Sequence, residues 1–264
     1  MRFRFSRRQL AIPYGLFMVL FIALPLLLIG VYAFTDSQMN FTLDNITKFF
    51  TDRSAVNAVV LSVWVGLLTT VACILLGFPI AYILSTSKFF RSPQILIIMF
   101  ILPMWINFIL RTLATKEIFH LIGLKLNETA AVIGMIYNFL PFMILPIYTA
   151  LLKMDKSLIE AAQDLGASPT QVFLRVIIPN SLPGVLSGVL MVFMPTISTF
   201  AITDLLTGYN MQLIGNLINI NIQGAGSWNY GAALSLIILI IIAVGMYFTE
   251  RGNKDKEEVR GGLW

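Results

Sequence analysis

Charged side chains are scarce in this chain. They make up 12% of its 264 residues, whereas 58% of the residues are hydrophobic. A soluble domain carries about 25% charged residues, so this composition excludes an ordinary water-soluble globular protein. The charges are also clustered, and several long windows contain none. We therefore expect a membrane protein, and the net charge of +5 is explained by loops at lipid headgroups rather than by nucleic-acid binding.

Cysteine and histidine each occur once. A single cysteine forms no intramolecular disulfide, and Cys73 lies in an apolar run where we expect it to pack as a small apolar residue. His120 has no second His or Cys near it in the sequence, so we expect it to lie in a solvated outer loop and to hold no metal. The sequence thus predicts neither a disulfide framework nor a metal site.

Catalytic motifs are also missing from the sequence. No Gly-Lys pair occurs, so the phosphate-binding loop G-x-x-x-x-G-K-[ST] is absent. No nucleophile, base and oxyanion-stabilising group cluster together. We therefore predict a non-catalytic chain that binds no cofactor of its own.

The charge-free windows are long enough for membrane-spanning helices of about 20 residues each. The last window is too long for one span, and its first half is rich in Asn and Gly, which places the helix in its second half. We predict a single all-α membrane domain, residues 1–264, with six transmembrane helices at about 11–34, 57–84, 94–112, 130–151, 183–203 and 230–249.

Lys and Arg in short loops favour the cytoplasmic side of a membrane. With the N-terminus inside, most of the 18 Lys and Arg residues, including Arg2, Arg4, Lys88 and Arg91, fall on the cytoplasmic side. The sequence therefore predicts that both termini and the loop 155–179 are cytoplasmic.

A polar, helix-forming segment, EAAQDLGASPTQVFLRVIIP, lies between two apolar runs. Asp155 or Ser157 can cap a short helix there, and Glu160 falls in its first turn, where a carboxylate favours the positive end of the helix dipole. We expect Gly166 to end that helix. A second short helix is expected to pack onto the membrane domain through Phe173, Val176 and Ile177.

This segment resembles the EAA loop of ABC-importer permeases, whose pattern is matched by Glu160, Ala161, Ala162, Gly166 and Pro179. The strings FTLDNIT near Phe41, GFPIAYIL near Gly77, LPMWINFILR near Pro103, YNFLPFMILPIY near Tyr137 and ITDLLTGYNMQLIGNLI near Asp204 are similar to PotB-type permeases of spermidine/putrescine importers. The resemblance covers nearly the whole chain. It implies the type I, MetI-like permease fold in a bacterial cytoplasmic membrane.

The resemblance also implies a function and partners. The expected function is polyamine translocation, driven by a homodimeric PotA-like ATPase that binds ATP and Mg. A second, different PotC-like permease and an extracellular PotD-like substrate-binding protein complete the expected assembly. The expected contacts with the ATPase are Glu160, Ala161, Ala162, Asp164, Leu165, Gly166 and Ala167, with residues 160–168 as the coupling helix.

Residues that are costly to place in lipid mark the candidate translocation path. Asp204 is the leading one, because a carboxylate inside the bilayer costs about 2.5–3.5 kcal/mol. We expect it to close the helix that begins near Pro183, and we expect Pro195 to break that helix. Asp204 lies either in the path or at the outer interface. A carboxylate and aromatic faces suit a polyamine, which gives a path set of Asp204, Phe200, Trp105, Tyr137 and Asn107.

Arg111 lies four residues after Asn107, so the two are expected to share a helical face near the outer end of the third span. Arg111 either snorkels outward or pairs with an acid, such as Asp204 or one on the second permease. A cation would repel a polyamine, so we favour a structural or gating ion pair.

Other functions remain open from the sequence alone. Related permeases handle other small solutes, such as an aminophosphonate, thiamine or ferric iron, and a basic path would favour an anion. A self-sufficient secondary transporter would need an intramembrane acid for ion coupling, and Asp204 is the one candidate. Such a transporter would leave the EAA loop without a purpose.

Overall fold

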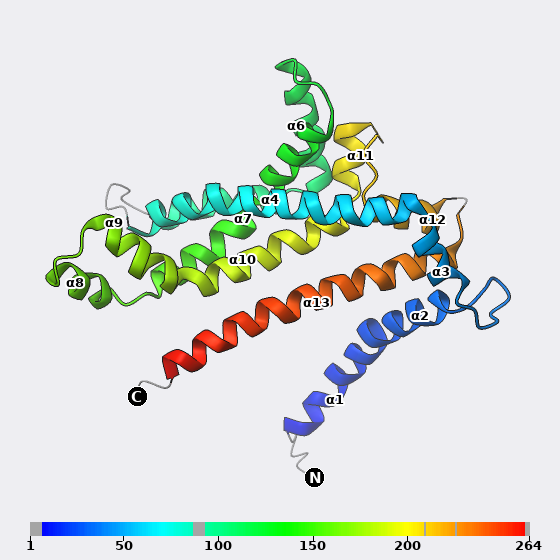
Figure 1. The fold of residues 1–264 in the computed structure, drawn as a ribbon, viewed down its shortest axis with the longest axis horizontal. Coiled ribbons are helices and arrows are strands. Elements are labelled where there is room, and N and C mark those ends of the chain that lie inside the picture. The colour runs from blue at the N-terminus through cyan, green and yellow to red at the C-terminus, as the bar shows by residue number, and fades with distance from the viewer. Residues whose placement is uncertain (1–6, 87–92, 209, 225, 262–264) are drawn as a thin grey trace, which may run out of the picture. The chain divides into compact units, whose positions relative to one another are not determined.

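The computed structural model describes residues 7–86, 93–208, 210–224 and 226–261. Arg2, Arg4, Lys88 and Arg91, which contribute to the predicted charge asymmetry, lie outside these ranges. The described helices are α1 (Arg7–Met18), η1 (Val19–Ala23), α2 (Leu24–Ala33), α3 (Asp44–Thr51), α4 (Arg53–Thr86), α5 (Pro93–Ile101), η2 (Leu102–Trp105), α6 (Phe108–Leu121), α7 (Glu128–Leu152), α8 (Ser157–Asp164), α9 (Pro169–Val172), η3 (Phe173–Ile177), α10 (Ile178–Ser198), α11 (Ala201–Thr207), α12 (Ile214–Gln223) and α13 (Trp228–Gly261) (Figure 1).

The described part of the chain is helical, and its one β-type pairing is an isolated bridge between Thr35 and Phe41. Five helical segments are long and apolar enough to cross a membrane, and the number rises to six if one sharply bent pair counts as a single span. The five are Ile12–Ala33, Arg53–Thr86, Glu128–Leu152, Pro169–Ser198 and Trp228–Tyr247. The all-α membrane class predicted from composition is confirmed.

The third predicted span, at about 94–112, is divided by a sharp bend. Ile97–Trp105 and Phe108–Leu121 are bent by 102° at the break between them. Ile106 is extended, and the side chain of Asn107 caps α6 by accepting a hydrogen bond from Ile109 N at 2.8 Å. Asn107 is therefore the N-cap of a new helix. His120 lies in the last turn of α6 rather than in the expected loop.

The fifth span also differs from its prediction. Pro195 lies inside α10, and the break comes at Thr199 and Phe200. The hydroxyls of Thr196 and Ser198 bond to carbonyls of the preceding turn, which supports the helix past the proline. Asp204 consequently lies in the first turn of the separate helix α11 and does not close α10.

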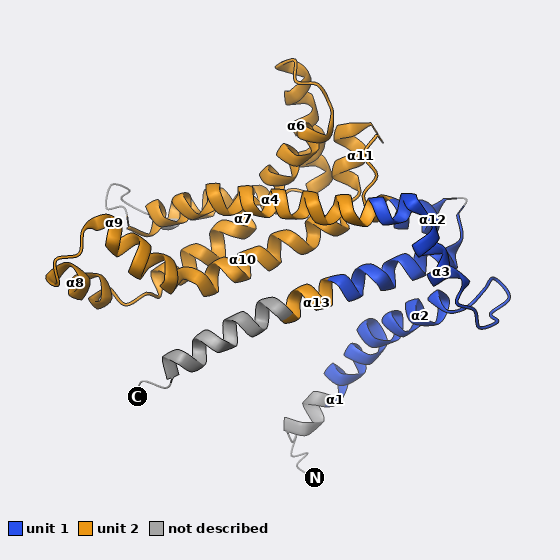
Figure 2. Ribbon diagram, viewed as in Figure 1, with its two compact units in different colours: residues 1–57, 217–241 blue, residues 58–216, 242–264 orange. Residues whose placement is uncertain are grey.

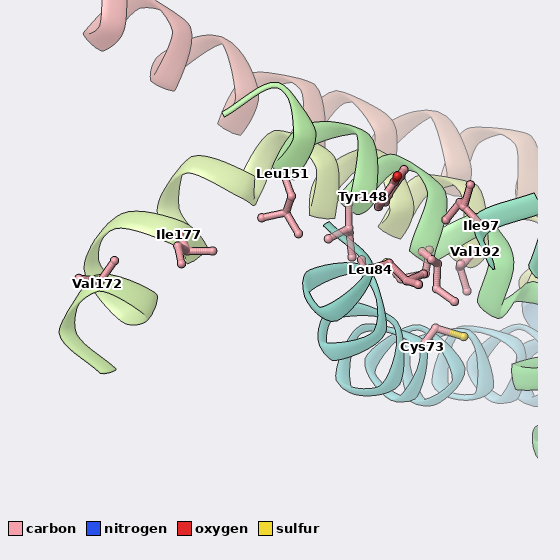
Figure 3. Packing of buried hydrophobic residues seen from close by; sticks show 12 residues of the cluster. Cys73, Leu84, Ile97, Tyr148, Leu151, Val172, Ile177 and Val192 are labelled. Atoms are coloured by element: carbon pink, nitrogen blue, oxygen red, sulfur yellow. The ribbon is translucent and has the colours of Figure 1, made fainter. Parts of the chain in front are cut away.

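The chain forms two compact units, residues 1–57 with 217–241 and residues 58–216 with 242–264 (Figure 2). In the second unit, α4, α7 and α10 run side by side, with α8 and α9 at one end of α10 and α11 following its other end (Figure 1). Their shared core joins Cys73 of α4, Ile147 of α7 and Val192 of α10, all fully buried (Figure 3). Cys73 packs in this core as the sequence predicts.

Glycines allow close approach of helices in this core. A Cβ placed on Gly184 of α10 would lie 2.6 Å from Ala150 Cβ and 2.7 Å from the Pro146 carbonyl oxygen of α7. Small residues give such proximity between membrane helices, where packing rather than the hydrophobic effect drives association. The α7–α10 crossing therefore depends on the missing side chain.

In the first unit, the buried Asn229 at the start of α13 holds the end of α2 by hydrogen bonds. Its amide donates to the Thr35 carbonyl at 2.8 Å, and that carbonyl also accepts from Asn45 of α3 at 2.9 Å. Tyr230 donates its hydroxyl to Asp52 at 3.1 Å, and Lys48 Nζ lies 4.3 Å from the Tyr230 ring centroid. Asn45 and Lys48 thus hold α3 against the end of α2 and the start of α13.

Candidate coupling loop and translocation pocket

The loop 155–179 begins with a capped helix. Asp155 Oδ1 accepts a hydrogen bond from Ser157 N at 3.0 Å, at the start of α8. This bond to the backbone, with a further one from the Ser157 side chain, lowers the pKa of Asp155 below its ordinary value of 3.8. Glu160 lies in the first turn of α8, as predicted, and is exposed.

Gly166 ends α8, as predicted. Its φ of +80° is a left-handed conformation that glycine adopts without a Cβ penalty. The Gly166 N–H donates to the Gln163 carbonyl at 2.8 Å, and the Ala167 N–H donates to the Ala162 carbonyl at 3.0 Å. These two bonds form a Schellman motif, which satisfies carbonyls that the helix end would otherwise leave free.

The two faces of α8 have different environments. Ile159 and Ala162 pack against the hydrophobic core of the second unit. Glu160, Ala161 and Asp164 are exposed on the helix, and Leu165 just after it is 89% exposed. Five of the seven expected docking residues are therefore exposed, whereas Ala162 and Ala167 pack against the core.

The second half of the loop anchors α8 to the bundle. Ser168 and Gln171 form a capping box, in which Gln171 Oε1 accepts from Ser168 N at 2.8 Å. Phe173 then makes edge contacts with Phe78 and Tyr82 of α4, with ring centroids 5.9 and 5.2 Å apart. Val172 and Ile177 are buried in the same cluster (Figure 3). The predicted order of helix, glycine break and helix is confirmed, as is packing of the second helix.

A cavity of about 830 Å³ adjoins this loop. It lies between α7 and α10 and extends to the start of α8. Its polar lining includes Thr149, Lys153, Asp155, Asn180 and Ser187. The start of α8 therefore lies next to the α7–α10 crossing.

A second cavity, about 510 Å³, lies where two helices are interrupted. It is lined by the break between η2 and α6 and by the break between α10 and α11, with α7 as a further wall. The residues that line it are Met104, Trp105, Ile106, Asn107, Phe108, Arg111, Phe139, Phe142, Pro195, Ser198, Thr199, Phe200 and Ala201. We call this cavity the break pocket.

The structure brings together three of the five predicted path residues. Trp105, Asn107 and Phe200 line the break pocket, and Trp105 is 86% exposed. Tyr137 on α7 and Asp204 on α11 do not line it. Two of the three aromatic residues of the predicted path therefore meet at one place, while Tyr137 and the Asp204 carboxylate lie outside it.

The Asp204 carboxylate is held by Asn216. Asn216 Nδ2 donates to Asp204 Oδ1 at 2.6 Å and to the Phe200 carbonyl at 3.3 Å. Its Oδ1 accepts from Thr203 Oγ1 at 3.1 Å and from Leu213 N at 2.9 Å. The buried Asn216 therefore uses both amide donors and its carbonyl to join α11, α12 and the break before α11.

Arg111 is buried, with 8% of its surface exposed, although it carries a charge in the break pocket. Its Nε and Nη1 have no hydrogen-bond partner among the described residues. Of the two alternatives for Arg111, outward snorkelling is therefore not observed. It also forms no ion pair with Asp204 in the described structure, because that carboxylate faces Asn216.

The sequence as a whole matches one protein family. Residues 4–254 fit the model of the "Binding-protein-dependent transport system inner membrane component" family. The chain belongs to this family. Its helices, exposed loop and interrupted spans are therefore those of a transport permease of a bacterial inner membrane.

Curated relatives of the permease align along nearly its full length. It is 35% identical over 261 residues to the "Spermidine/putrescine transport system permease protein PotB" of Escherichia coli (strain K12), covering 90% of this chain and 94% of that protein. It is 32% identical to the protein of the same name from Haemophilus influenzae, covering 95% of each. The "Inner membrane ABC transporter permease protein YdcU" of E. coli is 29% identical, covering 86% of this chain and 82% of that protein.

Solved structures share the permease fold. A chain of a bacterial ABC transporter involved in the import of the acidic polysaccharide alginate matches with a TM-score of 0.70 at 17% identity, covering 92% of this chain and 94% of that chain. The MetNI methionine ABC transporter, in an inward-facing conformation, matches with a TM-score of 0.59 at 18% identity, covering 76% and 96%. These similarities support the ABC-importer permease fold expected from the EAA loop.

One important residue of this permease, Asn216, escaped the sequence reasoning. Asn216 lies in an Asn- and Gly-rich segment that was read only as lying outside the sixth span, yet the segment contains α12. The alternation of Ile and Asn from Ile218 to Ile222 has the period of a strand, so the local pattern did not predict the helix that forms there. Arg111 was considered from the sequence, because a charged side chain is costly to place in an apolar region. That cost predicts a partner without saying which one.

Proposed function

We propose that this chain is a permease subunit of an ATP-driven importer that translocates polyamines such as spermidine and putrescine. The observation that carries the proposal is 35% identity to a spermidine/putrescine permease over 90% of the chain. The exposed surface of α8 supports the ATP-driven part, because it offers a binding site for another protein. The chain supplies no catalytic group of its own in this proposal.

In the proposed topology, residues 1–264 act as one permease domain that crosses the membrane six times. The bent pair Ile97–Trp105 and Phe108–Leu121 counts as one of these spans. Both termini and the loop 155–179 lie in the cytoplasm, in agreement with the excess of Lys and Arg in those segments.

We propose that one subunit of the ATPase dimer binds the loop and that closure of the two ATPase subunits drives alternating access. Glu160, Ala161 and Asp164 contact the ATPase together with Leu165, and the Gly166 and Ala167 turn holds that surface in shape. The anchor at Phe173 transmits the motion to α4, because its ring packs on Phe78 and Tyr82. A second, different permease completes the path, and an extracellular binding protein delivers the substrate.

The proposed path passes the break pocket. Trp105 and Phe200 offer aromatic faces to the methylenes and ammonium groups of a polyamine, with Asn107 beside them. Asp204 and Tyr137 act at other points of the path. Weak, transient contacts suffice, because tight binding in the path would slow release.

The decisive experiment is uptake of labelled spermidine into proteoliposomes that contain this chain, its ATPase, its second permease and the binding protein. We expect uptake to require ATP, to be inhibited by unlabelled putrescine and to fall several-fold in Asp204→Asn. ATP hydrolysis without polyamine uptake would overturn the polyamine assignment and leave the importer class standing.

An anionic solute is the second candidate, because the cation Arg111 lines the break pocket. The same vesicles test it with a labelled aminophosphonate. Uptake of that anion in place of spermidine would favour the second candidate.

A further inference from the structure

The break pocket is electropositive. Arg111 contributes a full charge to its lining, and no Asp or Glu is among the described residues that line it. Asn107 and Phe108 bring the N-terminal end of α6, a helix of 14 residues, to the same wall. A helix N-terminus carries a partial positive charge, which adds to the field of the guanidinium.

The Arg111 guanidinium is also unsatisfied. The side chain is more than nine-tenths buried, and two of its three nitrogens, Nε and Nη1, have no hydrogen-bond partner among the described residues. Buried charges in proteins are normally paired, because removal from water without a partner is costly. The arginine fork matches the two oxygens of a carboxylate.

No acid among the described residues binds Nε or Nη1 of Arg111. Asp204 lies in the neighbouring helix α11, but its carboxylate is taken by Asn216 at 2.6 Å. The missing anion therefore comes from outside the chain.

The rim of the pocket indicates a protein partner. Trp105 is 86% exposed, and Ile106 and Phe108 are 53% and 43% exposed, directly beside the buried Arg111. Aromatic residues and arginine are enriched at the energetic centres of protein interfaces, where an apolar rim excludes water from a charge pair. A hydrated ion needs no such rim.

We propose that the break pocket receives an acidic side chain of the second permease subunit, whose carboxylate pairs with Arg111. This inference rests on the proposed function, because it needs a second permease. The pair neutralises the one charge that would repel a polyamine in the pocket. Trp105 and Phe200 can therefore contact a cationic substrate only when both subunits are assembled.

The first test compares the isolated chain with the assembled complex. Arg111→Met should raise the melting temperature of the purified full chain in detergent, because it removes an unpaired buried charge. In the complex, the same change should weaken retention of the second permease during affinity purification by roughly tenfold or more. Arg111→Lys should keep part of the retention, and Arg53→Met, at an exposed arginine, should change neither measurement.

The second test locates the acid. In a Cys73→Ala background, Arg111→Cys is paired with cysteine substitutions of each acidic residue in the membrane region of the second permease. We expect oxidative cross-linking at one acid, and we expect a Lys substitution of that acid to restore the retention lost in Arg111→Glu.

The outcomes separate this inference from the proposed function. If wild-type chain assembles with the second permease and Arg111→Met assembles equally well, the pair is absent and only the inference fails. If Arg111→Met instead removes stabilisation by phosphatidylglycerol or by inorganic phosphate, the occupant is a phosphate oxyanion and the inference is overturned. If no second permease assembles with the wild-type chain, the inference and the heteromeric importer fail together.

Discussion

Asn216 donates a 2.6 Å hydrogen bond to Asp204 and holds the carboxylate against its own chain. The acid that sequence reasoning placed first in the path is thus part of a buried network that joins α11 to α12. The basic residue Arg111, by contrast, has two nitrogens without a partner in the described structure. Asp204, which accepts this hydrogen bond, follows the break between α10 and α11. Arg111, with its two unpartnered nitrogens, follows the break between η2 and α6.

The Asn216 network predicts a stability defect. Asn216→Leu should lower the free energy of unfolding by about 1–3 kcal/mol, because the Asp204 carboxylate and the Leu213 N–H lose their partner in a buried site. The control is Asn221→Leu, whose part-buried amide donates to the one carbonyl of Leu217. Thermal unfolding of both variants in detergent measures this loss of stability. Equal melting temperatures for the two variants would contradict the prediction that the Asn216 network stabilises the fold.

Glu160 should matter for coupling rather than folding. Because Glu160 is exposed in the first turn of α8, Glu160→Ala should leave the melting temperature unchanged and strongly reduce ATP-dependent uptake in proteoliposomes. Gln163→Ala, at another exposed position of the same helix, serves as the matched control. Full uptake by Glu160→Ala would remove this residue from the coupling surface.

Gly184 should tolerate no side chain. Gly184→Ala places a Cβ 2.6 Å from Ala150 Cβ and 2.7 Å from the Pro146 carbonyl, so α7 and α10 must separate. We expect a loss of about 1–3 kcal/mol in unfolding free energy. At Gly15, where a Cβ meets nothing within 4 Å, alanine should be neutral or slightly stabilising. Denaturant titration of both variants checks the difference. An unchanged free energy of unfolding in Gly184→Ala would mean that α7 and α10 separate without cost.

Asp155 should make the start of α8 sensitive to acid. Its folded pKa lies below the ordinary 3.8 because the ionised carboxylate accepts the Ser157 N–H. The stabilisation is therefore present above the unfolded pKa and is lost as the pH falls through the folded value. Hydrogen exchange of the Ser157 amide should accelerate below pH ~4, beyond the intrinsic pH trend, and this excess should vanish in Asp155→Asn.

Local patterns in the sequence predicted the form of the loop 155–179 well. The Asp155 cap, the turn at Gly166 and the packing of Phe173 all depend on residues close in sequence, so spacing and propensity suffice to predict them. The helix breaks were harder to predict. Pro195 is a strong helix breaker in isolation, but hydroxyls of Thr196 and Ser198 compensate for it within α10.

The sequence by itself determined the membrane class, the positions of the apolar spans and the form of the loop 155–179. Hydrophobic length and local helix chemistry decide these features, and both are local properties of the chain. Only the tertiary structure decided that Trp105, Asn107 and Phe200 meet in one pocket. It also decided that Asp204 is held by Asn216 while Arg111 is buried unpaired. These depend on which segments distant in sequence pack together, and a carboxylate or guanidinium carries no local sign of the partner it will meet.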